Sequence, residues 1–172
     1  TYTIMGDTSQ NIHFQYGLKD WAELRRLILT GDYDAVGLLR KSYRNTVEIS
    51  EYANEILRHG DFSIYPVEPI IRHGANVCVE PVQGESALFG RTAETIRDWQ
   101  RKGYETIAVI CRDEEEAERV AARLAEDVPV KNGAKGEAEE FGDGVMVLPV
   151  SYTKGLEFDA VLLFDPSEKK YP

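Results

Sequence analysis

A near-continuous apolar run, Thr106–Cys111, is followed at once by an amphipathic helical pattern over residues 113–127. A strand without polar alternation is typical of a sheet that is covered on both faces. In the helical segment, apolar residues recur every three to four positions, and Asp113 with Glu116 forms a capping pattern at its start. This pair of elements predicts an α/β fold with a mostly parallel sheet flanked by helices.

The same alternation of strand and helix patterns extends along the chain and contains no internal repeat. Further strands are expected at residues 1–5, 35–39, 75–82, 128–131, 145–150 and 160–164. Further helices are expected at residues 19–30, 46–59 and 85–102, the second of them capped by Thr46. The length suits one domain with a core of its own, so we expect a single α/β lobe over residues 1–172.

The chain is acidic, with 30 Asp and Glu residues against 20 Lys and Arg residues and a formal net charge of -10. A protein that binds nucleic acid mainly through charge is expected to be basic. Any contact with nucleic acid therefore depends on a local patch, on stacking side chains, or on basic surface outside these residues.

Membrane and metal signals are absent from the sequence. No apolar run approaches the length that crosses a bilayer, and the first residues show no signal peptide, so we expect a cytoplasmic protein without membrane contact. Cys78 and Cys111 each lie in an apolar run, which predicts two buried free thiols. Two cysteines alone form no metal-ligand pattern, and we expect no metal site within the chain.

Three polar loops follow expected strands, at residues 6–10, 42–46 and 153–158. In open parallel sheets, ligands bind at the carboxyl ends of strands, so these loops are the candidate site. Gln10 can orient a water molecule or contact a phosphate, as glutamine does in other nucleotide hydrolases. The alternative interpretation is a turn in which Asp7 bonds to its own backbone.

The other two loops combine charge with an aromatic ring or a glycine. Arg44 can act as an arginine finger on a terminal phosphate, and Tyr43 can stack on a base. The alternative is a surface arginine beside a core tyrosine. Glu157 can accept hydrogen bonds from ribose hydroxyls, while Lys154 can bind phosphate. The alternative there is a solvated turn whose apolar neighbours lie in the core.

The order of these loops adds information that no single loop carries. The segments concerned are Gly6-Asp7-Thr8-Ser9-Gln10, Tyr43-Arg44 and Lys154-Gly155-Leu156-Glu157-Phe158. In that order they resemble the third, fourth and fifth motifs of superfamily-one helicases of the UvrD/PcrA group, and the resemblance spans nearly the whole chain. It implies a RecA-like lobe of the P-loop NTPase type, namely the second motor lobe of an ATP-dependent DNA helicase.

The resemblance also implies roles for individual residues. The residues that act on the transferred phosphoryl group would be Gln10 and Arg44. The nucleotide would be contacted by Tyr43, Gly155 and Glu157. Single-stranded DNA would be contacted by His13, Phe14, Ser151 and Lys154. The implied partners are the first RecA-like lobe of the same protein and single-stranded DNA.

Two departures from the family pattern keep alternatives open. Gln15 stands where the family has a tryptophan after the third motif, and Ser151-Tyr152 stands where a histidine usually precedes the fifth motif. The second departure resembles the HelD branch, whose members act with RNA polymerase. One alternative is therefore a lobe that remodels or recycles RNA polymerase, and the other is a non-enzymatic α/β interaction module.

The sequence lacks both a Gly-x-x-x-x-Gly-Lys-Ser/Thr loop and a strand-terminal Asp-Glu pair for magnesium. The resemblance implies ATP and Mg²⁺ as cofactors of the intact, ATP-hydrolysing protein. Because both motifs are missing here, neither is expected to bind tightly to these residues alone. Residues 1–18 are expected to be either the tail of the first lobe or part of the second.

Overall fold

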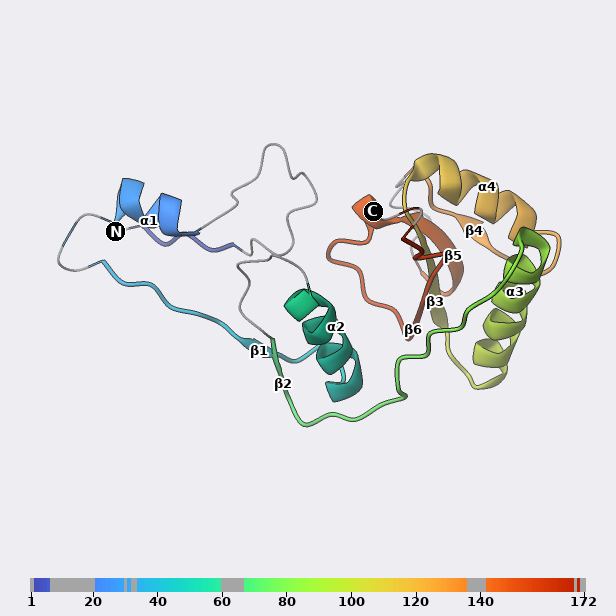
Figure 1. The fold of residues 1–172 in the computed structure, drawn as a ribbon, viewed down its shortest axis with the longest axis horizontal. Coiled ribbons are helices and arrows are strands. Elements are labelled where there is room, and N and C mark those ends of the chain that lie inside the picture. Colours follow the sequence, from blue (N-terminus) through green and yellow to red (C-terminus); the bar gives the residue numbers. More distant parts are fainter. Residues whose placement is uncertain are drawn as a thin grey trace. The chain divides into compact units, whose positions relative to one another are not determined.

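The computed structural model of the protein describes residues 2–6, 21–29, 31, 34–59, 67–135, 142–168 and 170. The chain forms two compact units, Thr1–Glu80 and Pro81–Pro172. Each unit has a sheet and helices of its own (Figure 1). Across the described ranges, every helix is too short or too polar to traverse a lipid bilayer.

The second unit contains a four-stranded sheet in which every pairing is parallel. In the order β4-β5-β3-β6, its strands are Lys131–Asn132, Gly144–Pro149, Thr106–Cys111 and Ala160–Leu163. Val109 of β3 lies opposite Val147 on one side and Leu162 on the other. Two helices flank the sheet, α3 (Glu85–Arg101) and α4 (Glu114–Leu124). The predicted α/β class with a mostly parallel sheet is thereby confirmed.

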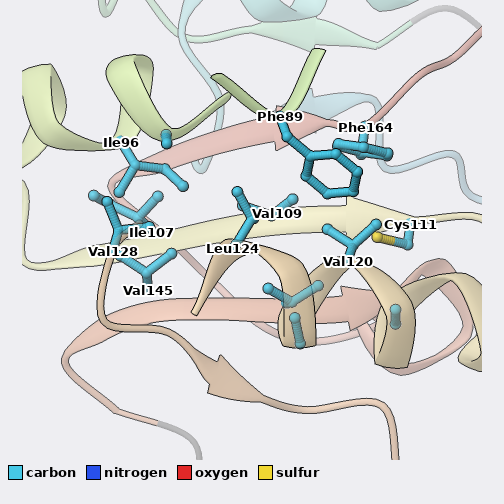
Figure 2. Close-up of a cluster of buried hydrophobic side chains, with 14 of the residues drawn as sticks. Phe89, Ile96, Ile107, Val109, Cys111, Val120, Leu124, Val128, Val145 and Phe164 are labelled. Carbon is cyan, nitrogen blue, oxygen red and sulfur yellow. The ribbon is translucent and has the colours of Figure 1, made fainter. Parts of the chain in front are cut away.

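A hydrophobic core fills the space between this sheet and its two helices (Figure 2). It includes Ile107, Val109 and Cys111 of β3 together with Ile96 of α3 and Leu124 of α4. Each of these five side chains is at most 1% exposed. Full burial of a large apolar side chain contributes about 1.5–3 kcal/mol, so this cluster is the main source of stability for the second unit.

Two aromatic rings extend the core toward the carboxyl ends of β3 and β6 (Figure 2). Phe164 directly follows β6, and its ring centroid lies 5.2 Å from that of Phe89 in α3. The guanidinium groups of Arg119 and Arg123 in α4 lie 5.8 and 5.6 Å from the Phe89 centroid. These cation–π contacts join α4 to α3 above the sheet.

Local signals set the start of α4 and the end of α3. The Asp113 carboxylate accepts a hydrogen bond of 2.9 Å from the N–H of Glu116, which is the cap expected from the sequence. Gly103 follows α3 with φ of +85°, a left-handed conformation that glycine adopts readily.

The other face of the sheet is covered at its centre and open at one edge. Ala108 and Leu148 have no exposed surface, whereas Val161 and Leu163 of β6 are 46% and 57% exposed. In the connection from β3 to β4, α4 lies over the face of the sheet that faces the hydrophobic core. Residues 150–159 connect β5 to β6 and cross the sheet in the opposite direction. Because connections between parallel strands are right-handed, these residues belong to the face opposite α4.

The first unit contains two helices and one short parallel pairing. Its elements are α1 (Trp21–Ile28), β1 (Lys41–Ser42), α2 (Val47–His59) and β2 (Glu68–Pro69). β1 pairs with β2. Thr46 caps α2 as expected, because its hydroxyl accepts a hydrogen bond from the N–H of Ile49 at 3.4 Å. The side-chain amide of Asn54 bonds to both the C=O and the N–H of Val67, which joins α2 to the start of β2.

Several sequence expectations for the first unit are wrong. The described residues 2–5, 35–39 and 75–82 form no strand, and β1 begins only at Lys41. Every residue from 71 to 80 is exposed, so the alternating pattern there has no covered face to bury its apolar side chains against. Cys78 is accordingly exposed, whereas Cys111 is buried as expected.

Candidate functional site

The carboxyl ends of β5, β3 and β6 lie at the same edge of the sheet because these strands are parallel. Polar residues follow each strand. Residues 150–159 follow β5, Arg112 and Asp113 follow β3, and Asp165 and Lys170 come after β6. Open parallel sheets bind ligands at this edge, which we call the carboxyl edge.

The loop after β5 contains a tight turn that presents Lys154 to solvent. The chain passes through the 3-10 helix Val150–Tyr152 and then turns, with the N–H of Leu156 donating to the C=O of Thr153 at 3.1 Å. Gly155 has φ of +84°, as a turn of this kind requires at its third position. Apart from its chain neighbours, no atom lies within 4 Å of the place a Cβ on Gly155 would occupy, so a ligand can approach the backbone there.

Tyr152 joins this loop to the helix that follows β3. Its hydroxyl donates a hydrogen bond of 2.6 Å to Oε1 of Glu114, the first residue of α4. The hydrogen bond raises the pKa of Tyr152, because the carboxylate stabilises the neutral, donating form of the hydroxyl. The start of the loop is thereby attached to the carboxyl edge.

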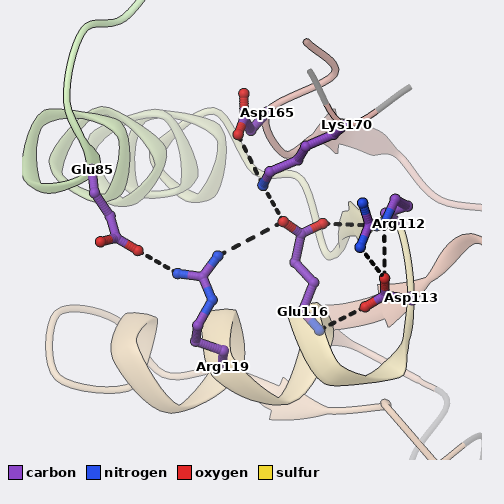
Figure 3. Close-up of polar contacts among 7 residues, drawn as sticks. All are labelled: Glu85, Arg112, Asp113, Glu116, Arg119, Asp165 and Lys170. Carbon is purple, nitrogen blue, oxygen red and sulfur yellow. Dashed lines mark hydrogen bonds and ion pairs between the residues drawn. The ribbon is translucent and has the colours of Figure 1, made fainter. Parts of the chain in front are cut away.

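Glu116 is the centre of a charge network at the same edge (Figure 3). Its side chain is 8% exposed, accepts a hydrogen bond of 2.9 Å from the N–H of Arg112, and pairs with Arg119 and Lys170. Lys170 also lies 2.8 Å from Asp165. A carboxylate removed from water needs such partners to offset its desolvation. The network joins the segment after β6 to the first turn of α4.

The first turn of α4 is occupied by the protein's own carboxylates. Asp113 accepts the N–H of Glu116, and Glu116 accepts the N–H of Arg112. Acidic residues also fill positions 113–116. A helix N-terminus binds phosphate when its N–H groups are available and no negative charge repels the anion. This turn is therefore unsuited to phosphate, and the loop after β5 is the better candidate at this edge.

Four of the predicted site residues lie together in the second unit. They are Ser151, Lys154, Gly155 and Glu157, and all four are exposed. The apolar residues between and beside them, Leu156 and Phe158, are half-buried.

The other predicted site residues are not in this loop. Tyr43 and Arg44 lie in the first unit, shortly before α2, and both are exposed. Tyr43 is 70% exposed, which excludes the alternative of a core tyrosine. The remaining predictions, Gln10, His13 and Phe14, lie outside the described residues.

Most of the contacts that organise the carboxyl edge have no signal in the sequence. Tyr152 and Glu114 are 38 residues apart, and Lys170 and Glu116 are 54 residues apart. No local pattern links residues at such distances. Only the cap formed by Asp113 and Glu116 had a sequence signal.

The acidic side chains of the described residues do not form a metal site. Nowhere in residues 21–29, 34–59, 67–135 or 142–168, or in the short stretches described beside them, are three His, Cys, Asp or Glu side chains grouped to hold a metal ion. At the carboxyl edge, Asp113 and Glu116 are engaged by backbone N–H groups and by arginine and lysine side chains.

Comparison with known proteins does not assign the chain to a family. No protein-family model matches it, and no curated protein matches it either. The class defined by the fold is an α/β protein with a parallel sheet. A functional interpretation therefore depends on the three motifs and on the geometry of the loops that carry them.

Proposed function

We propose that this chain is the second motor lobe of a nucleic-acid-dependent ATPase of superfamily one, similar to the UvrD/PcrA helicases. In this proposal it contributes groups to an ATP molecule that a first RecA-like lobe holds with Mg²⁺. The observation that carries the proposal is the exposed loop after β5, in which Lys154 and Gly155 lie in a tight turn and Glu157 follows two residues after Gly155.

The loop offers two kinds of contact to a nucleotide. The open side of Gly155 admits a ligand to the backbone, and the Glu157 carboxylate can accept hydrogen bonds from ribose hydroxyls. Residues of this loop can also reach nucleic acid. In the proposal, the contacts with single-stranded DNA are made by His13, Phe14, Ser151 and Lys154.

The chain has the properties expected of half an ATP site. Its sequence contains no phosphate-binding P-loop, and the first turn of α4 is filled by carboxylates. A nucleotide held chiefly by another lobe would meet only single side chains from this one.

Arg44 is the proposed arginine finger. It is exposed and precedes α2, whose first turn is capped by Thr46. A guanidinium placed against the transferred phosphoryl group stabilises the charge that develops in the transition state, and Gln10 would act on the same group. Tyr43 would lie near the adenine. Closure of the lobes on ATP and opening after hydrolysis would move them along the DNA strand.

The proposal is tested by replacing Arg44 with alanine in the intact protein that includes the first lobe. We expect ATP turnover to fall by about a thousandfold or more, because that is the usual contribution of an arginine finger. Arg58→Ala is the matched control, since Arg58 lies on the exposed surface of α2 and pairs with Glu55. Unchanged turnover in Arg44→Ala would favour the non-enzymatic α/β module instead.

A HelD-like lobe that remodels or recycles RNA polymerase is the second candidate. The net charge of -10 favours it, because an acidic lobe is better suited to a protein partner than to a charge-driven grip on DNA. Tyr152 also favours it, since this departure from the helicase pattern is built into the loop through Glu114. RNA polymerase retention by the intact protein, measured beside strand displacement, separates the two outputs.

A further inference from the structure

The connection between β5 and β6 is short for the path it takes. Residues 150–159 run from the carboxyl end of β5, past β3, to the amino end of β6. Parallel strands are usually joined by about a dozen or more residues, commonly with a helix among them. Here the only helical turn is the 3-10 helix Val150–Tyr152, so the connection has few residues beyond those that the path requires. The positions of its two ends therefore determine where its middle lies.

The second end of this connection is attached to the start of β3 by Asp159. Oδ2 of Asp159 accepts hydrogen bonds from the N–H of Glu105 at 3.0 Å, from the N–H of Thr106 at 2.9 Å, and from the hydroxyl of Thr106 at 3.0 Å. In return, the N–H of Asp159 donates to the C=O and the hydroxyl oxygen of Thr106, both at 2.9 Å. The carboxylate and the backbone N–H of Asp159 thus join two segments that are 53 residues apart.

The donors around Asp159 favour its charged form. Hydrogen bonds from the backbone of Thr106 and of Glu105, and then from the Thr106 hydroxyl, lower the pKa of Asp159. The carboxylate is therefore ionised at neutral pH, and its hydrogen bonds are charge-assisted, which makes them stronger than bonds between neutral groups.

The first end of the connection is attached at the opposite end of β3. Tyr152 bonds to Glu114 just beyond the carboxyl end of that strand, whereas Asp159 bonds to Thr106, which is the first residue of the strand. The segment 153–158, which contains Lys154 and Glu157, is therefore attached at both of its ends, near the carboxyl end of β3 and near its amino end.

We propose that Asp159 and Thr106 form a positioning clamp, which holds the segment 153–158 in place so that Gly155 and Glu157 are presented to a nucleoside triphosphate. Asp159 itself lies at the amino end of β6 and acts through the segment. The functional half of this inference rests on the proposed function, whereas the structural half concerns this chain alone.

The structural half is tested by amide hydrogen exchange on the chain. Thr106→Val removes the hydroxyl but keeps the shape and strand preference of the side chain, whereas Thr106→Ser keeps the hydroxyl and removes the methyl group. We expect amides in 153–159 to exchange about tenfold faster in Thr106→Val and in Asp159→Asn, with the rest of β3 and β5 unchanged and with Thr106→Ser close to wild type. Thr95→Val is the control, because the Thr95 hydroxyl bonds within α3, to the C=O of Arg91.

Two results overturn the clamp. Exchange that rises equally throughout the second unit would mean that Asp159 and Thr106 support the fold as a whole. Exchange that stays unchanged in 153–159 would mean that the segment is held by other contacts. Either result is independent of whether the protein hydrolyses ATP.

The functional half is tested in the intact protein by steady-state ATP hydrolysis. We expect Thr106→Val to raise the KM for ATP about tenfold while kcat stays within about twofold, because the segment contacts the bound nucleotide rather than the transferred phosphate. Thr106→Ser should restore the KM. Faster local exchange with an unchanged KM would overturn the role in nucleotide presentation. Failure of the proposed function is recognised separately, by unchanged turnover in Arg44→Ala.

Discussion

The hydroxyl of Tyr152 donates a hydrogen bond of 2.6 Å to the carboxylate of Glu114, although 38 residues separate the two in the chain. Tyr152 ends the 3-10 helix after β5, and Glu114 begins the helix after β3. Because β3 and β5 are parallel neighbours, their exits lie side by side, and one hydrogen bond is enough to connect them. The loop that carries the fifth motif is thus attached to the helix of the adjacent strand.

This hydrogen bond predicts a high pKa for Tyr152. The pKa is raised in the folded state, so the contact stabilises the fold below the ordinary tyrosine value near 10, and its contribution is lost as pH rises through the folded value. NMR titration of ¹³C-labelled tyrosine, assigned with Tyr152→Phe, should show Tyr152 ionising above 10. Glu114→Ala should return the pKa toward 10, whereas Glu115→Ala, on the same helix turn, should not. A normal pKa in the wild type would show that the contact is absent in solution.

Truncation of two leucines in the second unit should lower the free energy of unfolding by unequal amounts. Leu124 of α4 has no exposed surface, whereas Leu163 of β6 is 57% exposed. Leu124→Ala leaves a cavity and should lower the free energy of unfolding by about 2–5 kcal/mol. Leu163→Ala should change it by about 0.5 kcal/mol or less. Urea unfolding followed by Trp99 fluorescence, in a Trp21→Phe background, measures both, and equal losses would contradict the described core.

The two cysteines should differ sharply in reactivity. Burial raises the pKa of Cys111 to about 12, so at pH 8 only about one molecule in ten thousand carries the reactive thiolate. Cys78 is exposed. A thiol reagent should therefore modify one cysteine per native chain, and Cys78→Ser should abolish that reaction. Both thiols should react in denaturant, and fast labelling of Cys111 in the native chain would contradict its burial.

Glu48 should make the first unit sensitive to acid. Its carboxylate accepts hydrogen bonds from Nδ1 of His73 at 2.8 Å and from the N–H of Gly74 at 2.9 Å. These contacts, the one with His73 first, lower its pKa from 4.5 to about 2. The stabilisation is therefore present above about pH 4.5 and is lost as pH falls toward 2.

The change that tests this is Glu48→Gln. Its urea midpoint should lie below that of the wild type at pH 7, and the difference should shrink at pH 3, with Trp21 fluorescence as the probe in a Trp99→Phe background. Glu51→Gln, an exposed acid on the same helix, is the control and should show no such convergence. A difference that is constant with pH would exclude the assigned role of Glu48.

The elements with strong local signals could be predicted from the sequence. Thr106–Cys111 is an apolar run that forms β3, and the cap at Asp113 forms as its pattern indicates. The strand expected at 75–82 fails because alternation alone cannot supply a neighbouring strand or a covered face. At the candidate site, the sequence identified the segment with Lys154 and Glu157, but it contained no signal for Asp159 as its anchor.

By itself, the sequence of this protein determined what depends on neighbouring residues: the α/β alternation, the helix caps at Thr46 and Asp113, and the glycine that the turn at Gly155 requires. Tertiary structure alone decided which distant groups meet, such as Asp159 with Thr106 and Lys170 with Glu116. The reason is physical. Capping and turn formation are settled within one turn of chain, whereas strand order decides which loop ends become neighbours, and strand order depends on the packing of the whole core.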